Sequence, residues 1–537
     1  RVGNLLARRG RFGYTHPEPI ETAISLALEE VADELPAALT LLRLFAFLPC
    51  DAIPTDLLAD GVAALDGPLR ALASEDLASQ ATFILRQISL IQHSTSTNTF
   101  HINRIVQTIV REKIPKKAQR QWVQRVVRLI YTVFPSADFE NWSLCEKYLI
   151  QAKECAHLIE EFGLVEDEAA QLLLCLGSYR LQRAYYQEAE QYFNQALHIC
   201  QALETLASTE HPGTSYALNS LALLYHMRGH YQQAEDIYHQ ALELRKNAAK
   251  PDQHAVAQTY NNLANLYKDQ GKLQQSVERL RQAIEIDEQA LGRDHPETAK
   301  IKSNLAFLYD EQGYHRIAED LHTQVYNIMS QNLPVGHPDI ALSLNALATN
   351  AVAQGDYQRA ETLYRDAIFQ QEQHLGSEHS DTLQSLNNLA YLYTRQAKYQ
   401  EAEPLYQQVL AIYEHRFGHN HPLTAVVLTN LGWLYHLMQQ EDFAENLLRR
   451  SLAINEQVPG KDTLDTYSCI SMIARFLIDQ QRYEDAYPFS QRALKICQDR
   501  YGPENQRTLE AQEQQRIVFK GINDRHRMPN DVFLEQE

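Results

Sequence analysis

The stretch TYNNLANLYKDQGK, residues 259–272, decides the fold. Its large or apolar side chains recur three and four residues apart, which is the spacing of one face of an α-helix. The stretch ends at a glycine, Gly271, which suits the left-handed conformation found after a helix C-terminus. It therefore predicts a helix followed by a sharp turn. The residues of the helical face are Tyr260, Leu263, Ala264 and Tyr267.

The same pattern returns along the chain at a strict interval of 42 residues, so it marks a repeat. A displaced earlier copy occupies residues 176–197, which makes eight units. Small residues let two antiparallel helices approach closely, and stacked pairs bury stripes that a single pair cannot bury. The large position recurs as Leu221, Leu263, Leu305, Leu347, Leu389, Leu431 and Ile473. The small position after it recurs as Ala222, Ala264, Ala306, Ala348, Ala390, Gly432 and Ala474.

These units resemble tetratricopeptide repeats, in the long 42-residue form also seen in kinesin light chains. The resemblance covers about 168–500 and implies a right-handed superhelix of helix pairs. We expect an array of eight units over 168–502, with Ala264, Ala306 and Ala390 buried at close helix contacts. A capping helix and a tail are expected over 503–537.

Residues 1–115 do not repeat and predict a different domain. The segment 36–49 has a helical apolar pattern, and 53–61 predicts a short helix after a proline. Two strands, SLIQH and TFHIN, flank a turn at 94–98 and are followed by a further helix. Helices followed by a two-stranded wing predict a winged-helix domain. The fold class is therefore all-α: a winged helix with a small β-hairpin, then the repeat superhelix.

The segments HPEPIETAISLALEEV (16–31) and FHINRIVQTIVRE (100–112) resemble signalling ATPases of the NB-ARC type in the STAND class. The resemblance implies an ATPase domain upstream, an ARC-like winged helix at 1–115, a bridging helical pair at 116–167 and the repeats as the sensor. The chain starts without a methionine, so we expect it to be a piece of a longer polypeptide. Members of the class often carry a Met-His-Asp triplet, and the matching positions are Ile102, Asn103 and Arg104. Asn103 in place of the histidine puts nucleotide sensing through this motif in doubt.

Motifs for catalysis and for cofactor binding do not occur in the sequence. No GxxxxGK[ST] loop is present to cradle a triphosphate, and no GxSxG nucleophile elbow occurs. We therefore expect no enzyme activity, no catalytic residue and no cofactor. Histidines recur between units, but successive repeats lie about 10 Å apart, too far to share one metal ion, so interhelix loop and cap roles are predicted. They are His211, His295, His337, His379 and His421.

The charge distribution bears on partners and location. Residues 1–120 hold 13 bases and 13 acids, so the remainder carries the whole net charge of −19. An acidic surface repels phosphate backbones, and the few bases at Arg104, Arg111 and Lys113 disfavour a DNA-binding winged helix. No apolar run approaches the roughly 20 residues of a membrane span, and the seven scattered cysteines suit a reducing compartment. We expect a cytoplasmic protein that binds neither nucleic acid nor membrane.

Asparagines recur on the face of the first helix that does not pack, so they are expected to line the concave side. Side-chain amides donate and accept, and a ladder of them can hold an extended peptide. The same amides can instead join one repeat to the next, and the sequence leaves both alternatives open. The candidate ligand-binding residues are Asn219, Asn261, Asn265, Lys268, Lys300, Asn345, Asn387, Tyr391, Arg395 and Trp433.

The predicted function is ligand sensing and protein interaction within a STAND-type signal-transduction ATPase. A protein or peptide would bind the concave repeat face, and the upstream ATPase domain of the same polypeptide would receive the signal. The alternative is a constitutive scaffold or cargo adaptor of the kinesin-light-chain type, without a switch.

Overall fold

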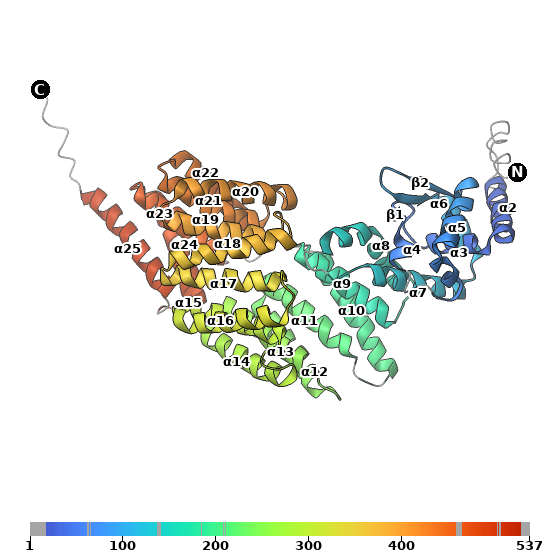
Figure 1. Cartoon of the computed structure of the whole chain (residues 1–537), viewed down its shortest axis with the longest axis horizontal. Helices are drawn as coiled ribbons and strands as arrows, with labels where there is room; N and C mark the ends of the chain where they lie inside the picture. Colours follow the sequence, from blue (N-terminus) through green and yellow to red (C-terminus); the bar gives the residue numbers. More distant parts are fainter. Residues whose placement is uncertain are drawn as a thin grey trace, which may run out of the picture. The chain divides into compact units, whose positions relative to one another are not determined.

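The computed structural model describes residues 18–527, except for 62, 63, 65, 137–140, 184, 208, 210, 458–463, 502, 504 and 505. It divides into two compact units, 1–224 and 225–537, each of which is described by itself. Figure 1 labels the helices and strands along the chain. Among the described residues, every helix is too short or too polar to cross a lipid bilayer.

The first unit begins with a small domain of helices around a three-stranded antiparallel sheet. The strand order is β1-β3-β2, with Phe100 opposite both Ile53 and His93. The helices are α2 (Glu18–Glu34), α3 (Pro36–Phe45), α4 (Leu57–Asp60), the 3₁₀ helix η3 (Gly67–Ala73), α5 (Glu75–Gln87) and α6 (Arg104–Lys113). The strands are β1 (Ile53–Pro54), β2 (Ile91–Ser94) and β3 (Thr99–Ile102).

The predicted hairpin is confirmed by β2 and β3. The sheet has one strand more than predicted, because β1 pairs with β3. The predicted helix over 53–61 is wrong at its start, because Ile53 and Pro54 form β1 and pair with β3. A proline cannot donate to a ladder but is tolerated in an edge strand, and β1 is such a strand.

One hydrophobic core runs through the described part of the first unit, from Ile24 to Cys200. It continues from the small domain into α7 (Lys116–Val133) and α8 (Trp142–Glu161), and then into the first repeat pair, α9 (Asp167–Gln182) and α10 (Tyr186–Ala207). Close packing of that pair depends on Gly177, where an added Cβ atom would lie 2.5 Å from the ring of Phe193. The helix α11 (Pro212–Met227) spans the division between the units.

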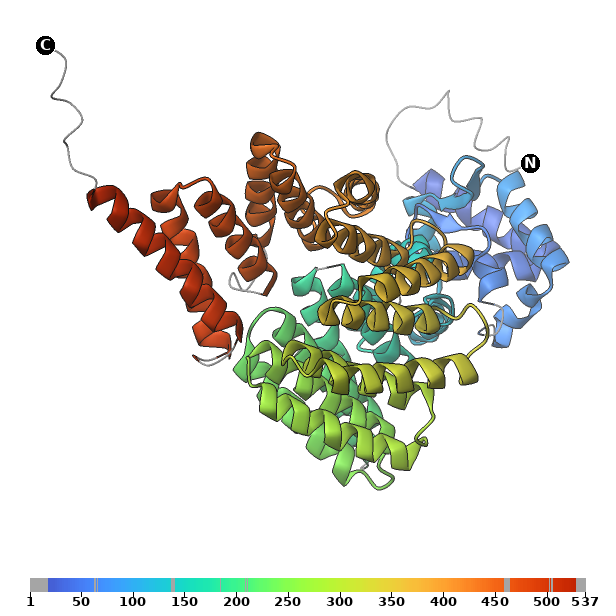
Figure 2. The ribbon, with the colours of Figure 1, turned by 60° about the vertical axis from the view of Figure 1, so that its left-hand side comes forward.

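The second unit is a stack of antiparallel helix pairs, and the pairs follow a curved path (Figure 2). In the described residues from 167 to 501, the chain forms eight pairs in all, as the repeat predicts. The remaining helices are α12 (Tyr231–Asn247), α13 (Gln253–Asp269), α14 (Leu273–Ala290), α15 (Pro296–Glu311), α16 (His315–Asn332), α17 (Pro338–Gln354), α18 (Tyr357–His374), α19 (Ser380–Arg395), α20 (Tyr399–Phe417), α21 (Pro422–Leu437), α22 (Glu441–Asn455), α23 (Leu464–Asp479), α24 (Tyr483–Tyr501) and α25 (Gln506–Arg527).

The small residues of the repeat lie at the helix contacts, as predicted. Ala264, Ala306 and Ala390 are fully buried. In the pair α13–α14, the second small position is Ser276, whose hydroxyl donates to the carbonyl oxygen of Ala264 at 2.7 Å. This bond shows how closely the two backbones approach.

Tyrosines of the first helices join neighbouring repeats by hydrogen bonds. Each hydroxyl donates to a glutamate on the second helix of the preceding pair, which explains why a tyrosine stands there instead of a phenylalanine. Burial and the Glu235 carboxylate raise the pKa of Tyr267 to about 12. The bonds are Tyr267 to Glu235 at 2.8 Å, Tyr393 to Glu361 at 3.0 Å and Tyr435 to Glu403 at 2.9 Å.

The turn between the two helices of a pair contains a residue in the left-handed conformation. In some repeats this residue is not glycine. Gly313 and Gly355 have φ values of 83° and 82°. At the same position in the next three repeats, Ala397, Gln439 and Gln481 have φ values of 58°, 61° and 59°. Non-glycine residues in this region carry a strain of roughly 1–2 kcal/mol, so tertiary packing imposes the turn there.

The histidines between repeats cap helices, in agreement with the predicted loop and cap role. In His295 the ring nitrogen Nδ1 accepts from the backbone N–H of Glu297 at 3.2 Å, which satisfies a donor at the start of α15. His337, His379 and His421 accept in the same way at the starts of α17, α19 and α21.

The capping helix α25 lies within the 503–537 expected for the capping helix and tail, and it spans Gln506–Arg527. It contacts both α23 and α24. Near its start, Arg507 Nη2 lies 3.7 Å from Glu311 Oε1 of α15. The predicted tail at 528–537 lies outside the described residues.

Candidate functional site

The first helices of the pairs form the inner layer of the second unit. From α15 onward, each first helix contacts the first helix of the next pair, and α23 contacts α25. In a curved stack the members of the inner layer lie closest together, so the free face of these helices is the inner surface. This places the predicted concave residues on α13, α15, α17, α19 and α21 within the second unit.

On α19, three predicted site residues form one stripe, because Asn387, Tyr391 and Arg395 are spaced four residues apart. Arg395 Nη1 donates to the Tyr391 hydroxyl at 3.2 Å, and its guanidinium carbon lies 6.0 Å from the centre of the same ring. Tyr391 keeps 36% of its surface exposed. The Tyr391 ring and the Arg395 guanidinium therefore lie side by side on α19.

On the neighbouring helix α21, Trp433 occupies the position of Tyr391 one repeat later. The guanidinium carbon of Arg475, on α23, lies 5.1 Å from the centre of the indole. The sequence prediction missed Arg475, although it stands 42 residues after Trp433 and the repeat spacing alone could have found it. We call Tyr391, Arg395, Trp433 and Arg475 the aromatic–arginine patch.

The patch combines two features of protein-binding surfaces. Tyrosine, tryptophan and arginine are the residue types most often found at binding hot spots. Both arginines lie against aromatic rings of the patch, and no ion pair engages either of them within the described part of the chain. The patch can therefore bind an acidic group beside an apolar one.

Two rows of asparagines, one at the repeat position of Asn261 and one at the next position of the helix, are joined to each other across repeats. Asn304 Nδ2 donates to Asn261 Oδ1 at 2.8 Å, and the capping helix continues the row because Gln514 Nε2 donates to the carbonyl oxygen of Ser471 at 2.9 Å. The pairing joins residues 43 apart, which are one repeat plus one residue apart. It favours the predicted alternative in which amides join repeats. Further pairs are Asn388 to Asn345 at 3.5 Å and Asn430 to Asn387 at 3.3 Å.

Lys300 lies in a salt-bridge cluster and does not project freely toward a ligand. Its Nζ atom lies 2.9 Å from Glu297 Oε1 and 3.1 Å from Asp339 Oδ2, which belongs to the next repeat. Burial alone would lower the pKa of Lys300, but the hydrogen bonds and charges of the two carboxylates outweigh it and raise the pKa. Lys300 therefore joins α15 to α17.

The remaining predicted residues lie apart from the patch. Asn265 and Lys268 are half-buried on α13, and neither side chain has a hydrogen bond or an ion pair with any other described residue. Asn219 lies on α11 in the first unit. Of the ten predicted residues, the structure brings Asn387, Tyr391, Arg395 and Trp433 together on α19 and α21.

We expect Asn430→Ala to lower the free energy of unfolding by about 0.5–1.5 kcal/mol, because it leaves the half-buried amide oxygen of Asn387 without its donor. Urea denaturation followed by circular dichroism measures this change. Asn265→Ala is the matched control and should leave the midpoint nearly unchanged. Equal midpoints for the two variants would contradict the joining role.

Comparison with known families agrees with the repeat seen in the structure. A tetratricopeptide repeat model matches residues 168–247, 255–331, 339–415 and 381–457, and a second one matches 466–507. The chain belongs to the tetratricopeptide repeat family. Such repeats are non-catalytic modules that bind proteins or peptides, so this chain is a protein-interaction module of that family. Residues 30–119 match a domain of unknown function (DUF7779).

Among solved structures, this tetratricopeptide repeat chain is similar to three kinds of protein. The tetratricopeptide-like repeats of a putative kinesin light chain from Podospora anserina are 30% identical, over 38% of this chain and 97% of that one, with a TM-score of 0.33. A STAND protein with a tetratricopeptide repeat sensor from Pyrococcus horikoshii is 14% identical, over 94% and 68%, with a TM-score of 0.50, and shows a shared fold. A Rap protein complexed with Competence and Sporulation Factor is 14% identical, over 75% and 99%, with a TM-score of 0.42. No curated protein matches the chain.

Proposed function

We propose that this tetratricopeptide repeat chain is the ligand-sensing and protein-interaction module of a STAND-type signal-transduction ATPase. A protein or peptide binds the inner face of the repeats, and the N-terminal domain relays this event to an ATPase domain upstream in the same polypeptide. The aromatic–arginine patch is the observation that carries the proposal.

The binding step rests on the composition and the exposure of the patch. Tyr391 and Trp433 lie on adjacent inner helices and supply apolar anchors, while Arg395 and Arg475 supply cations beside them. The chain as a whole carries a net charge of −19, so the two neighbouring arginines, which have no ion pair within the described residues, form a locally positive part of an acidic chain. They suit a partner segment that places acidic side chains next to aromatic or aliphatic ones.

The relay step rests on the continuity of the first unit. In our interpretation, the small N-terminal domain is a winged helix, with the β2–β3 hairpin as its wing and α6 following it. Asn103 caps α6, because its side chain accepts from the backbone N–H of Ile105 at 2.9 Å. The shared core from Ile24 to Cys200 supports a mechanical connection between this domain and the first repeat pair.

The similarity to the Pyrococcus horikoshii protein supports the same division of labour. That protein is described as a STAND ATPase with a tetratricopeptide repeat sensor, and the match to it covers 94% of this chain. The matched part therefore includes the N-terminal domain as well as the repeats. Cytoplasmic location and the absence of nucleic-acid and membrane partners are part of the proposal.

A constitutive cargo adaptor is the second candidate function. Its support is the 30% identity of the repeats to those of a putative kinesin light chain. An adaptor needs the patch but not a relay, so the N-terminal domain distinguishes the two candidates. An ATPase domain upstream in the intact gene product favours the sensor, and an upstream coiled coil favours the adaptor.

We expect Trp433→Ala to weaken the binding of a partner captured from cell extract with the full chain by about tenfold or more, as for a hot-spot residue. The indole is only half-buried, so the melting temperature should change little. Titration calorimetry measures the affinity and circular dichroism the melt. Phe369→Ala, on the second helix α18, is the control. An unchanged affinity for Trp433→Ala would refute the proposed binding face.

A further inference from the structure

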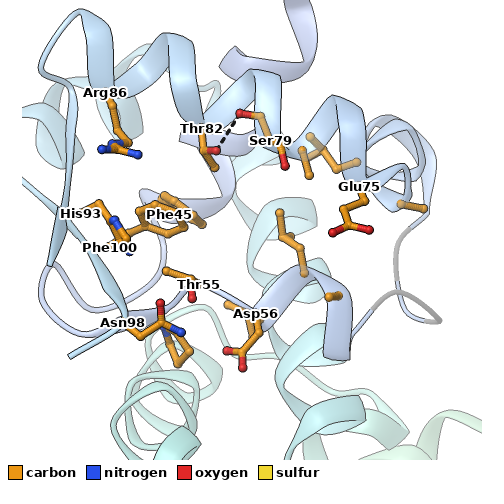
Figure 3. A pocket seen from close by; sticks show the side chains of 17 residues that line it. Phe45, Thr55, Asp56, Glu75, Ser79, Thr82, Arg86, His93, Asn98 and Phe100 are labelled. Atoms are coloured by element: carbon orange, nitrogen blue, oxygen red, sulfur yellow. Dashed lines mark hydrogen bonds between the residues drawn. The ribbon is translucent and has the colours of Figure 1, made fainter. Parts of the chain in front are cut away.

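The N-terminal domain contains a cavity of about 620 Å³ that the proposed function does not use. It lies between α5 on one side and the β1–α4 segment and the hairpin on the other (Figure 3). This volume is within the range of sites for small organic ligands, roughly 300–1,000 Å³. We call it the α5 pocket.

The base of the pocket is aromatic. The rings of Phe45 and Phe100 lie 5.9 Å apart and are almost fully buried. His93 is opposite Phe100 in the strand ladder, and their ring centres are 5.4 Å apart. Strand alternation puts His93 on the same face as buried Ile91, so a histidine occupies a position where an apolar residue would extend the core. The imidazole is half-buried and lines the cavity instead.

Two nitrogen-bearing side chains, Arg86 and His93, lie at this end of the pocket, and a third, Asn98, lines it on the other side of the aromatic rings. Figure 3 shows Arg86 and His93 near the two phenylalanine rings, with Asn98 below them. Arg86 is exposed near the end of α5, and Asn98 lies in the hairpin turn with a φ of 52°. Within the described residues, neither the Arg86 guanidinium nor the Asn98 amide nor the His93 imidazole has a side-chain hydrogen-bond partner, and the imidazole packs against the ring of Phe100.

The acidic residues of the pocket do not neutralise this end. Asp56 is engaged by Lys147, whose Nζ lies 2.6 Å from its Oδ2. Glu75 is in the first turn of α5, about 16 Å from Arg86 along the helix axis at 1.5 Å per residue. The helix dipole accounts for an acid in the first turn and a base in the last. It accounts for neither the histidine over Phe100 nor the cavity beside it.

We propose that the α5 pocket binds a small organic anion, an apolar group that carries a carboxylate or a phosphate. The apolar group would lie against Phe45 and Phe100. The Arg86 guanidinium would bind two oxygens of the anionic group at once, and the His93 imidazole would donate a further hydrogen bond. The site lies in the first unit and does not depend on the partner of the repeats.

The test is binding of phenylacetate, phenyl phosphate and the neutral phenylacetamide to the full chain, by calorimetry and ligand-detected NMR. At least one anion should bind about tenfold or more tightly than the amide, because a hydrogen bond to a charged group is stronger than one to a neutral group. Whichever anion binds more tightly assigns the carboxylate or the phosphate source. Arg86→Gln should remove this preference, and the control Arg70→Gln, an exposed arginine outside the pocket, should keep it.

A second variant, Ala78→Phe, places a ring in the cavity and should abolish binding of the anion and of the amide alike. Circular dichroism confirms that each variant is folded. Equal affinity for anion and amide, an unchanged preference in Arg86→Gln, or no saturable binding of either anion at millimolar concentration would overturn the proposal.

Discussion

Replacing His254 by leucine is expected to lower the free energy of unfolding by about 3 kcal/mol, because it leaves a buried carboxylate without its principal partner. Asp287, on α14, is fully buried. Its Oδ1 lies 2.8 Å from His254 Nδ1 of α13, and its Oδ2 accepts from the hydroxyl of Thr298 of α15 at 3.0 Å. Three helices of two repeats therefore meet at one carboxylate.

The tautomer of His254 follows from its second neighbour. Gln258 Nε2 lies 2.8 Å from His254 Nε2, so an amide that donates there leaves the proton on Nδ1 for Asp287. The double variant His254→Leu with Asp287→Leu should recover much of the loss, since paired replacement by apolar residues is often neutral. Urea denaturation measures the free energy of unfolding of the single and the double variant. A double variant no more stable than His254→Leu alone would contradict the assigned role of the buried carboxylate.

Ala306→Leu is expected to cost about 1–3 kcal/mol by overpacking the contact between α15 and α16. Ala306 is fully buried at the small position of its repeat. Three added carbon atoms must displace one helix from the other, because interiors are close-packed. Ala353→Leu, an exposed alanine near the end of α17, is the matched control and should be nearly neutral. A thermal melt of Ala306→Leu that matches the control would refute this packing scheme.

The repeats could be predicted from the sequence because their determinants are local and recur. Each unit needs a large residue, a small residue and a turn at fixed offsets, and 42-residue copies show all three. The sequence of the last three repeats does not mark the turn, because Ala397, Gln439 and Gln481 stand where the earlier repeats have glycine. Packing between repeats holds the turn there, and no single unit shows that.

The N-terminal domain was harder to predict because its pairings are distant in sequence. β1 consists of Ile53 and Pro54, too short to show strand alternation, and it forms only because Phe100 and Thr99 lie beside it. The α5 pocket was not foreseen for the same reason. Its walls come from segments around residues 45, 55, 80 and 95, which only the fold brings together.

The ligand-binding role of Tyr391, Arg395 and Trp433 stays a prediction, although their places on the first helices could be read from the repeat spacing. The sequence could not decide between the two roles of the asparagines. The role of the asparagines depends on how far one first helix is shifted along its neighbour. The shift places Asn304, and not Ser303, beside Asn261. Lys300 lies on a first helix, as the other candidate residues do, but its ammonium group forms salt bridges with Glu297 and Asp339.

The central claim is that the partner binds the inner face of α19, α21 and α23, and site-specific photocrosslinking tests it most directly. A benzoylphenylalanine is placed at Tyr391, at Trp433 or, as the control, at Phe369, which is 64% exposed on the second helix α18. After irradiation in cell extract, the same partner should be crosslinked from positions 391 and 433 and not from 369. A partner crosslinked from 369, and from neither inner position, would contradict the claim.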